Sequence, residues 1–571
     1  MRKFHSRQKL FLLCCCLYQI APAFSLATQQ QCVVASVHPL ATDAGIYAFE
    51  QGGNAVDAAI ATALTLGVVD NHNSGLGGGC FILIRKPDGS LLAIDGREKA
   101  PAAATSDMYV RDGKVDTKLS TFGPLAVGVP GALAAYDLAI EKCGQRKLAE
   151  LVMPAAEIAE RGFPIDQVYA RKLASKAKDL VHFSGSKAAL LKPDGSPYRT
   201  GETLRQPDLA RTYRKIAIDG PSWFYEGEFA QTVSKWMSEN GGIITAKDFA
   251  NYHPVQRKPV VTTYRDHQIV GFPPPSSGGV HVAQILNILE CFDLGEIYRR
   301  DPVRGTHLTV EAMKLAFADR AYWLGDPDFA DVPLGLIDKD YARELAKRIN
   351  PERLTDVPSH SQPPRAQEAL FGRHTTHIAA ADSEGYWVAI TATVNTSFGS
   401  KVIVPTTGVV LNNEMDDFSS QPGVPNAFNL IGAENNAIAP GKRPLSSMSP
   451  TIVLDQNGKP VMTVGAAGGP KIITQVLLTL IRKLDLEQDL DDVVAAPRFH
   501  HQWRPDYVLL EDAVSPEVTD GLKRYGHKIE RVDVSGITQA VAIDDEGNLH
   551  GVHDPRIPGK AAQVARKSQS E

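Results

Sequence analysis

The pattern of apolar residues along the chain predicts several buried helices. Residues 43–51 show helical spacing and end at Gly52-Gly53, a pair typical of a helix end. Asn54 can cap the next helix, residues 55–66, whose small and apolar residues indicate burial on all sides. Residues 471–484 place isoleucine, leucine and valine along one stripe, which predicts a helix packed on a sheet.

Short segments rich in β-branched residues predict antiparallel strands. They come in pairs separated by turn residues: 81–85 with 91–95, 376–381 with 387–394, and 451–454 with 461–465. The third pair encloses Asn457-Gly458, a strong hairpin signal. Residues 130–330 are mostly helical in pattern. Strands at the centre, with helices before and after them in both halves, predict an α+β fold with stacked sheets between helical layers.

The composition is that of an ordinary globular protein. The 571 residues are 43% hydrophobic and 22% charged, which permits a large core and excludes disorder for the bulk of the chain. The formal net charge of −5 argues against a nucleic-acid or anionic-membrane surface, since such surfaces require clustered basic charge. We therefore expect a soluble globular protein, and an enzyme.

The first 27 residues have the pattern of a secretory signal peptide. A basic stretch leads into nine apolar residues, 10–18, and small residues suited to cleavage follow at Ala21, Ala23 and Ala27. The apolar run is too short to cross a hydrocarbon core about 30 Å thick. We expect the signal to be removed and the mature protein to be exported, either to the periplasm or outside the cell.

Four cysteines follow this segment, at Cys32, Cys80, Cys143 and Cys291. Their wide and irregular spacing forms no CxxC pair and no disulfide framework. We expect them to be small buried apolar side chains, with one disulfide at most, and not to hold structural zinc.

Chemically useful residues concentrate between residues 374 and 469. Taken singly, each motif there also suits a turn or a surface loop. The sequence contains no phosphate-binding loop (GxxxxGK[ST]), no dinucleotide-binding motif (GxGxxG), no zinc-protease motif (HExxH) and no nucleophile-elbow motif (GxSxG). His500-His501 would point to opposite faces of a strand, so we expect a structural role for this pair.

Distinctive motifs follow one another along nearly the whole mature chain, at residues 52–59, 273–279, 325–329, 393–396, 411–418, 444–450, 465–469 and 497–503. Arg97-Glu98 and Asp319-Arg320 belong to the same set. This ordered set resembles the gamma-glutamyltranspeptidase family of N-terminal-nucleophile hydrolases. The resemblance implies a four-layer αββα sandwich, self-cleaved into two subunits that form one globular unit.

By this resemblance, the precursor would cleave itself between His374 and Thr375. A large subunit, residues 28–374, and a small catalytic subunit, residues 375–571, would remain together as a heterodimer. Thr375 would be the nucleophile. Its freed α-amine, with an ordinary pKa of about 7.7–8.0, would be the general base that a threonine hydroxyl needs.

The resemblance also assigns supporting roles around this nucleophile. Thr393 would orient the Thr375 hydroxyl, and Gly468 and Gly469 would donate backbone N–H groups to the oxyanion. The substrate α-carboxylate would be held by Arg97, Ser446 and Ser447, and its α-ammonium by Asn395, Glu414 and Asp417.

A loop over the site, residues 422–436, carries Phe428 where a tyrosine often gates access in bacterial relatives. Phenylalanine keeps the apolar ring and loses the hydroxyl, so we expect a looser lid and hydrolysis that competes well with transfer.

The reaction implied is cleavage of gamma-glutamyl amides, glutathione among them, through a gamma-glutamyl-Thr375 ester passed to water, an amino acid or a dipeptide. No cofactor or metal is expected, because the nucleophile, base and oxyanion donors all belong to the protein. One alternative is a related acylase acting on glutaryl-type or cephalosporin amides, whose substrates lack the α-ammonium. A second is an unprocessed, non-catalytic binding protein on the same fold.

Overall fold

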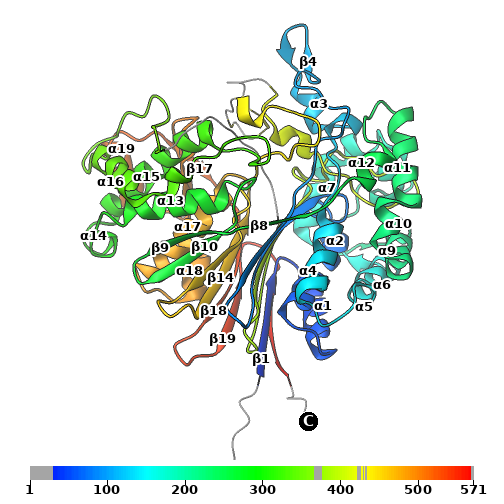
Figure 1. Cartoon of the computed structure of the whole chain (residues 1–571), viewed down its shortest axis with the longest axis horizontal. Helices are drawn as coiled ribbons and strands as arrows, with labels where there is room; N and C mark the ends of the chain where they lie inside the picture. The colour runs from blue at the N-terminus through cyan, green and yellow to red at the C-terminus, as the bar shows by residue number, and fades with distance from the viewer. Residues whose placement is uncertain (1–29, 365–375, 421–425, 428–429, 431–433, 567–571) are drawn as a thin grey trace, which may run out of the picture.

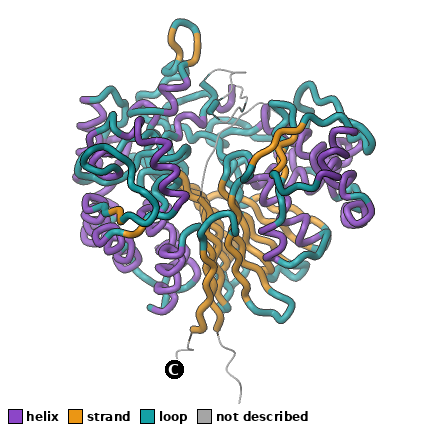
Figure 2. The backbone as a smooth tube through the Cα atoms, turned by 180° about the vertical axis from the view of Figure 1, so that it is seen from behind, coloured by secondary structure: helices purple, strands orange, loops and turns teal. Residues whose placement is uncertain are grey.

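A computed structural model describes residues 30–364, 376–420, 426–427, 430 and 434–566. Two antiparallel sheets lie at its centre, and helices cover both outer faces (Figures 1 and 2). The expected α+β class and four-layer αββα arrangement are confirmed. The signal segment 1–27, His374, Thr375 and Phe428 lie outside the described residues.

The first sheet has seven strands and the second has six. In spatial order the first contains β20 (Lys560–Arg566), β1 (Gln30–Ser36), β11 (Thr376–Asp382), β12 (Trp387–Thr393), β2 (Gly79–Arg85), β3 (Leu91–Gly96) and β8 (Val255–Arg257). The second contains β19 (Leu549–His553), β18 (Ile537–Ile543), β14 (Pro460–Ala467), β13 (Thr451–Leu454), β10 (His267–Gly271) and β9 (Val260–Tyr264). Short ribbons complete the set: β4 (Val110–Arg111), β5 (Lys114–Val115), β6 (Phe163–Pro164), β7 (Thr203–Leu204), β15 (Phe499–His500), β16 (Val508–Glu511) and β17 (Ile529–Val532).

Strand β11 shows why the two sheets stack. All seven of its residues are buried, and they alternate between two apolar environments. Ile378 and Ala380 pack with the helices on the outer face, whereas Ala379 and Ala381 pack against the other sheet. A strand that carries apolar residues on both faces is stable only between two layers.

The helices divide into two outer layers. On the seven-stranded sheet lie α1 (Pro39–Glu50), α2 (Ala55–Val69) and α4 (Ala132–Cys143), and on the six-stranded sheet α13 (Gly278–Leu289), α15 (Pro302–Trp323) and α17 (Lys471–Leu484). The others are α3 (Thr117–Thr121), α5 (Leu148–Leu151), α6 (Met153–Arg161), α7 (Gln167–Leu180), α8 (Ser184–Leu190), α9 (Pro207–Asp219), α10 (Pro221–Tyr225), α11 (Glu228–Glu239), α12 (Ala246–Ala250), α14 (Leu294–Arg300), α16 (Lys339–Arg348), α18 (Leu490–Ala495) and α19 (Pro516–Arg524).

Helix α2 begins as its sequence predicts. Asn54 accepts from the backbone N–H groups of Val56 and Asp57, and the Asp57 carboxylate accepts from the Asn54 N–H, which completes a capping box. All fifteen residues of α2 are buried. The helix runs to Val69, three residues beyond the expected end.

Residues 130–330 are mostly helical as expected, although strands β8, β9 and β10 interrupt the helices. One expectation about the cysteines needs correction. Cys32, Cys80 and Cys143 are buried as expected, but Cys291 is exposed, because it lies just beyond the end of α13. All four are free thiols.

The segments before and after residue 374 share both sheets. Strands β1, β2 and β3 precede this point, yet β11 and β12 are inserted between β1 and β2. Cleavage at 374/375 would therefore leave the two products interleaved by backbone hydrogen bonds. None of the helices within the described ranges combines the length and apolar character needed to cross a membrane.

Candidate active site

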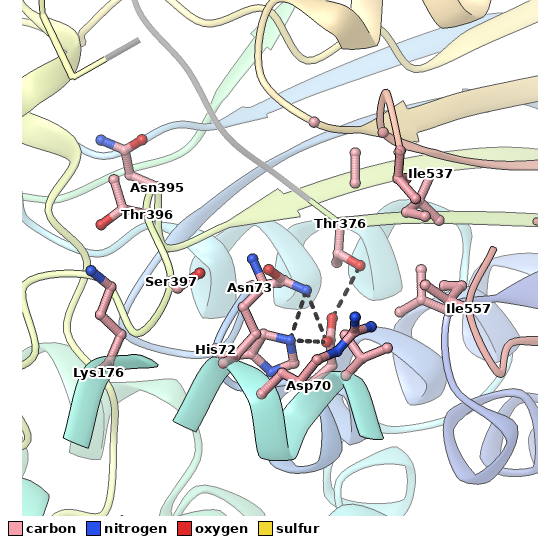
Figure 3. Close-up of a pocket in the computed structure, with 18 of the residues that line it drawn as sticks. Asp70, His72, Asn73, Lys176, Thr376, Asn395, Thr396, Ser397, Ile537 and Ile557 are labelled. Carbon is pink, nitrogen blue, oxygen red and sulfur yellow. Dashed lines mark hydrogen bonds and ion pairs between the residues drawn. The ribbon is translucent and has the colours of Figure 1, made fainter. Parts of the chain in front are cut away.

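A cavity of about 940 Å³ opens beside the first residue of β11 (Figure 3). Thr376, Asn395 and Gly468 line it, together with Asp70 and His72 from the segment after α2. Ionisable side chains also line it, and the basic ones outnumber the acidic: Lys118, Arg171, Lys172, Lys176, Lys401, Lys471 and Arg556 against Asp70, Asp166, Asp179 and Asp533.

Asp70 forms a polar cluster at the start of β11. Its carboxyl group lies 3.3 Å from the Thr376 hydroxyl and accepts from Asn73 Nδ2 at 2.9 Å, and His72 Nε2 is 3.3 Å away (Figure 3). Burial raises the pKa of Asp70 to about 8 and lowers the pKa of His72 to about 3. Both groups are therefore neutral near pH 7.

Asp70 and His72 are not among the site residues predicted from the sequence. A signal was present, because Asp70-Asn71-His72-Asn73 is a polar run placed between a largely apolar helix and a glycine-rich loop. Such a run at the end of a buried helix stays beneath the protein surface, and here it lies beside the cavity.

Asp70→Asn is expected to change how stability depends on pH. The folded pKa of about 8 lies above the unfolded value of 3.8, so between these values only the folded state keeps the proton. Wild-type stability therefore falls as pH rises through this window, whereas asparagine has no proton to lose. Between about pH 5 and about pH 7, the free energy of unfolding of the variant should rise relative to that of wild type by an amount on the order of 2 kcal/mol. Urea unfolding at the two pH values measures this change.

The exposed Asp545→Asn is the matched control, and its pH profile should follow that of the wild type. Parallel profiles for Asp70→Asn and wild type would contradict the protonated state assigned to Asp70.

Thr393, the last residue of β12, is held by close backbone packing. Its hydroxyl accepts from the Asn395 N–H at 2.8 Å. A Cβ on Gly78 would lie 1.8 Å from the Thr393 carbonyl oxygen, so only glycine fits there. The glycine-rich loop before β2 thus fixes the end of β12.

Gly468 and Gly469 connect β14 to α17. Their φ angles of 134° and 69° lie in the range that favours glycine. Gly468 lines the cavity, and α17 begins two residues after Gly469, at Lys471. A helix N-terminus favours negative charge, which suits the oxyanion role expected for these amides.

Asn395 is the member of the expected ammonium group that lines the cavity. Its Nδ2 donates to the Asn413 carbonyl at 2.9 Å. Its Oδ1 is buried and has no hydrogen-bond partner among the described residues. A buried acceptor in this state is suited to bind a donor from a ligand.

Arg97, Glu414 and Asp417 form a buried ionic cluster. Arg97 follows β3, and the two carboxylates belong to the 3₁₀ helix η3 (Glu414–Asp417). The Arg97 guanidinium donates to Glu414 and Asp417, and its Nε donates to the Pro444 carbonyl at 2.9 Å. All three side chains are fully buried. Burial raises the pKa of Glu414, and raises that of the adjacent Glu98 to about 7.

Arg97 and the two carboxylates were expected to hold opposite ends of a substrate. In this structure they pair with one another, and they do not line the cavity. Among the predicted residues, Asn395 and Gly468 line the cavity, whereas Thr393, Gly469, Ser446 and Ser447 do not.

Ser446 and Ser447 lie beside this cluster in the loop before β13. Ser447 Oγ accepts from the Arg320 guanidinium and lies 3.3 Å from Ser277 Oγ. The Ser277 hydroxyl also donates to the Ser446 carbonyl at 2.8 Å. Arg320, on α15, is thus a second buried cation at the predicted clamp. Arg320 belongs to one of the motifs found in the sequence, but no role was predicted for it.

The loop expected to cover the site contacts η3 where it is described. Asn436 Nδ2 donates to the Asp417 carbonyl at 2.6 Å, and the Ala427 N–H lies 3.3 Å from Asp416 Oδ2. His500 and His501 contact different partners, Thr474 and Asp506, as a structural role predicts.

Comparison with known proteins agrees with the resemblance seen in the sequence. The family model described as gamma-glutamyltranspeptidase matches residues 41–564. The glutathione hydrolase proenzyme of Escherichia coli strain K12 is 41% identical over 529 residues, which cover 92% of this chain and 90% of the relative. The acylase ACY 1 proenzyme of Pseudomonas sp. strain V22 is 36% identical over 549 residues, 94% of each chain.

Solved structures show the same fold. A cephalosporin acylase from Bacillus halodurans superimposes with a TM-score of 0.83 at 28% identity, covering 94% of this chain and 96% of the other. Helicobacter pylori gamma-glutamyltranspeptidase is 41% identical with a TM-score of 0.56, covering 57% of this chain and 94% of the other. This chain is an enzyme of the N-terminal-nucleophile hydrolase type, and it belongs to the gamma-glutamyltranspeptidase family.

Proposed function

We propose that this enzyme is a gamma-glutamyl transferase and glutathione hydrolase. One observation carries the proposal: Thr376, which directly follows Thr375 in the chain, opens β11 on the same cavity as Asn395 and Gly468. The nucleophile, an ammonium ligand and an oxyanion donor would then act in one space. The cavity's excess of basic side chains suits substrates such as glutathione, which carry carboxylates.

Self-cleavage would come first. The Thr375 hydroxyl attacks the His374 carbonyl carbon, and the peptide shifts from nitrogen to oxygen. Water then hydrolyses this ester, which leaves a carboxylate on His374 and a free amine on Thr375. The Helicobacter pylori structure supports a two-subunit product, because nearly all of its chain matches little more than half of this one.

Catalysis would use the same threonine. The Thr375 amine takes the hydroxyl proton as Oγ attacks the substrate γ-carbonyl, and the Gly468 and Gly469 amides stabilise the oxyanion. The leaving amine takes the proton, and a gamma-glutamyl-Thr375 ester remains. Water, an amino acid or a dipeptide then attacks this ester and releases glutamate or a new gamma-glutamyl amide. Thr393 would orient the hydroxyl, and no cofactor takes part.

The buried cluster would bind the amino-acid head of the substrate. This head carries one carboxylate and one ammonium, so it can enter an ionic cluster without adding net charge. The carboxylate would face Arg97, Ser446 and Ser447, and the ammonium would face Glu414, Asp417 and Asn395. Glutaryl substrates of the alternative acylase reaction lack the ammonium and would leave these carboxylates unmatched.

Asp417→Asn tests this choice of substrate. We expect the ratio of kcat/KM for gamma-glutamyl over glutaryl p-nitroanilide to fall about ten- to hundredfold, because a charged hydrogen bond to the ammonium is lost. A ratio taken on one preparation does not depend on the fraction of folded enzyme. Asp416→Asn is the matched control, since Asp416 accepts from Ser120 at 2.6 Å instead of pairing with Arg97. An unchanged ratio in Asp417→Asn would favour the acylase reaction.

We propose further that the N-terminal 27 residues export the protein and are removed, and that residues 28–374 and 375–571 form its two subunits. Phe428 would belong to the lid over the site.

A further inference from the structure

A buried group of possible metal ligands lies outside the active-site cavity. His307 and Glu311 are four residues apart on α15, so they lie on the same helix face. His527 joins them from the segment between α19 and β17. One ligand atom from each of the three lies within 4.8 Å of the others, and all three side chains are buried.

Backbone groups orient two of these side chains. His307 Nε2 lies 2.8 Å from the Asn350 carbonyl, which can only accept, so Nε2 carries the proton. The lone pair of a neutral His307 is then on Nδ1, which lies 2.7 Å from His527 Nε2. Glu311 Oε2 accepts from the Thr355 N–H at 2.8 Å. Such contacts fix the tautomer and orientation of metal ligands in known sites.

The remaining carboxylate oxygen has no such contact. Glu311 Oε1 is buried and has no hydrogen-bond partner among the described residues, although it lies only 3.9 Å from His527 Nε2. Leaving a buried acceptor without a partner costs about 1–3 kcal/mol. The missing hydrogen bond is explained if Glu311 Oε1 binds a ligand that is not a hydrogen-bond donor, such as a metal ion.

We propose that His307 Nδ1, Glu311 Oε1 and His527 Nε2 bind a divalent transition-metal ion, with zinc as the best fit. Two imidazoles, one carboxylate and a water form a common tetrahedral zinc set, with metal–ligand distances of about 2.0–2.2 Å. Ligand atoms in such a set are about 3.3 Å apart. The two histidine nitrogens would move apart by a few tenths of an ångström, and Glu311 would move closer. On binding, the His527 proton moves from Nε2 to Nδ1.

The surrounding charges permit a cation. Lys314 is one turn further along α15, but its charge is balanced by Asp506, 3.2 Å away, and its ammonium donates to the Thr355 carbonyl at 3.0 Å.

This metal would be structural, and the active-site chemistry still requires none. His307 and Glu311 precede residue 374, whereas His527 follows it. The ion would therefore join the two parts of the chain that the proposed cleavage separates. The site does not depend on that cleavage, because its side chains meet in the unbroken chain.

The test uses the untagged full-length protein, treated with EDTA and dialysed. Zinc titration followed by calorimetry should show one ion per chain, and Co²⁺ should give the visible absorption of a tetrahedral site. At zinc about a hundredfold above Kd, the Tm should rise by about 2–4 °C. The variants His527→Gln and His307→Gln should each fail to bind the ion, so zinc should not raise their Tm. Both variants should keep their gamma-glutamyl hydrolase activity.

His550→Gln is the matched control, because His550 is a surface histidine paired with Asp491 and should not affect binding. Should a histidine variant fail to fold, Glu311→Gln is tested in its place, and it should lose the visible Co²⁺ absorption of the tetrahedral site. If the wild type does not bind zinc stoichiometrically, the proposal is overturned, and the three side chains form only a hydrogen-bonded His–His–Glu group. Binding that survives in both histidine variants would overturn it as well.

Discussion

Thr375→Ala should remain a single chain and lose at least about 10⁴-fold in gamma-glutamyl hydrolysis. The proposed cleavage needs the Thr375 hydroxyl to attack its own peptide bond, and catalysis needs the same hydroxyl to form the ester. Without it neither step can occur. Intact mass of the denatured protein measures the first effect. The wild type should give a fragment that begins at Thr375 and has about a third of the precursor's mass, and the variant should give none.

Thr376→Ala is the matched control, because its hydroxyl contacts Asp70 and is not proposed to react. It should still release the fragment, and Thr375→Ser should release it as well, since it keeps a hydroxyl. If Thr375→Ala released the same fragment, the assignment of both the nucleophile and the cleavage site would fail. If Thr376→Ala blocked cleavage while Thr375→Ala permitted it, the nucleophile would be Thr376 and not Thr375.

The main elements were predictable because their sequence patterns are local and strong. Helix α17 has the bounds expected from its apolar stripe, and β11 and β12 match the expected pair within one residue. Strands β8 and β9 were missed because they are short and partly exposed, so their residues show little apolar alternation. Their position is decided by pairing with β3 and β10, which a local pattern does not contain.

The site was predictable as a set of residues but not as an arrangement. The resemblance identified Arg97, Glu414 and Asp417, yet Arg97 and Glu414 are 317 positions apart, and their direct pairing is a property of the fold. The same holds for Asp70, which reaches Thr376 across 306 positions. Contacts of this kind depend on how sheets and loops pack, so one sequence cannot reveal them.

Arg97→Met should destabilise the protein by about 3–5 kcal/mol and abolish measurable substrate binding. Methionine fills much of the volume but removes the cation that pairs with Glu414 and Asp417 beside the buried Glu98. Glu414 and Glu98 must then take up protons to remain buried, so their folded pKa values rise further above the unfolded ones. The folded variant then binds more protons than the unfolded chain, and its stability should fall as pH rises. Urea unfolding at about pH 5 and about pH 8 measures this difference.

The double variant Arg97→Met/Glu414→Gln separates the two roles of Arg97. Replacing one carboxylate by an amide removes a buried charge, so part of the lost stability should return, while the substrate carboxylate still has no guanidinium to bind it. Arg443→Met removes another buried arginine, one that lies near Asp95 and not beside Glu414, and controls for the loss of an arginine as such. Wild-type stability in Arg97→Met would contradict the buried cluster. Full activity in the double variant would mean that Arg97 only balances charge, and the carboxylate-binding role would then belong to Arg320, which already contacts Ser447.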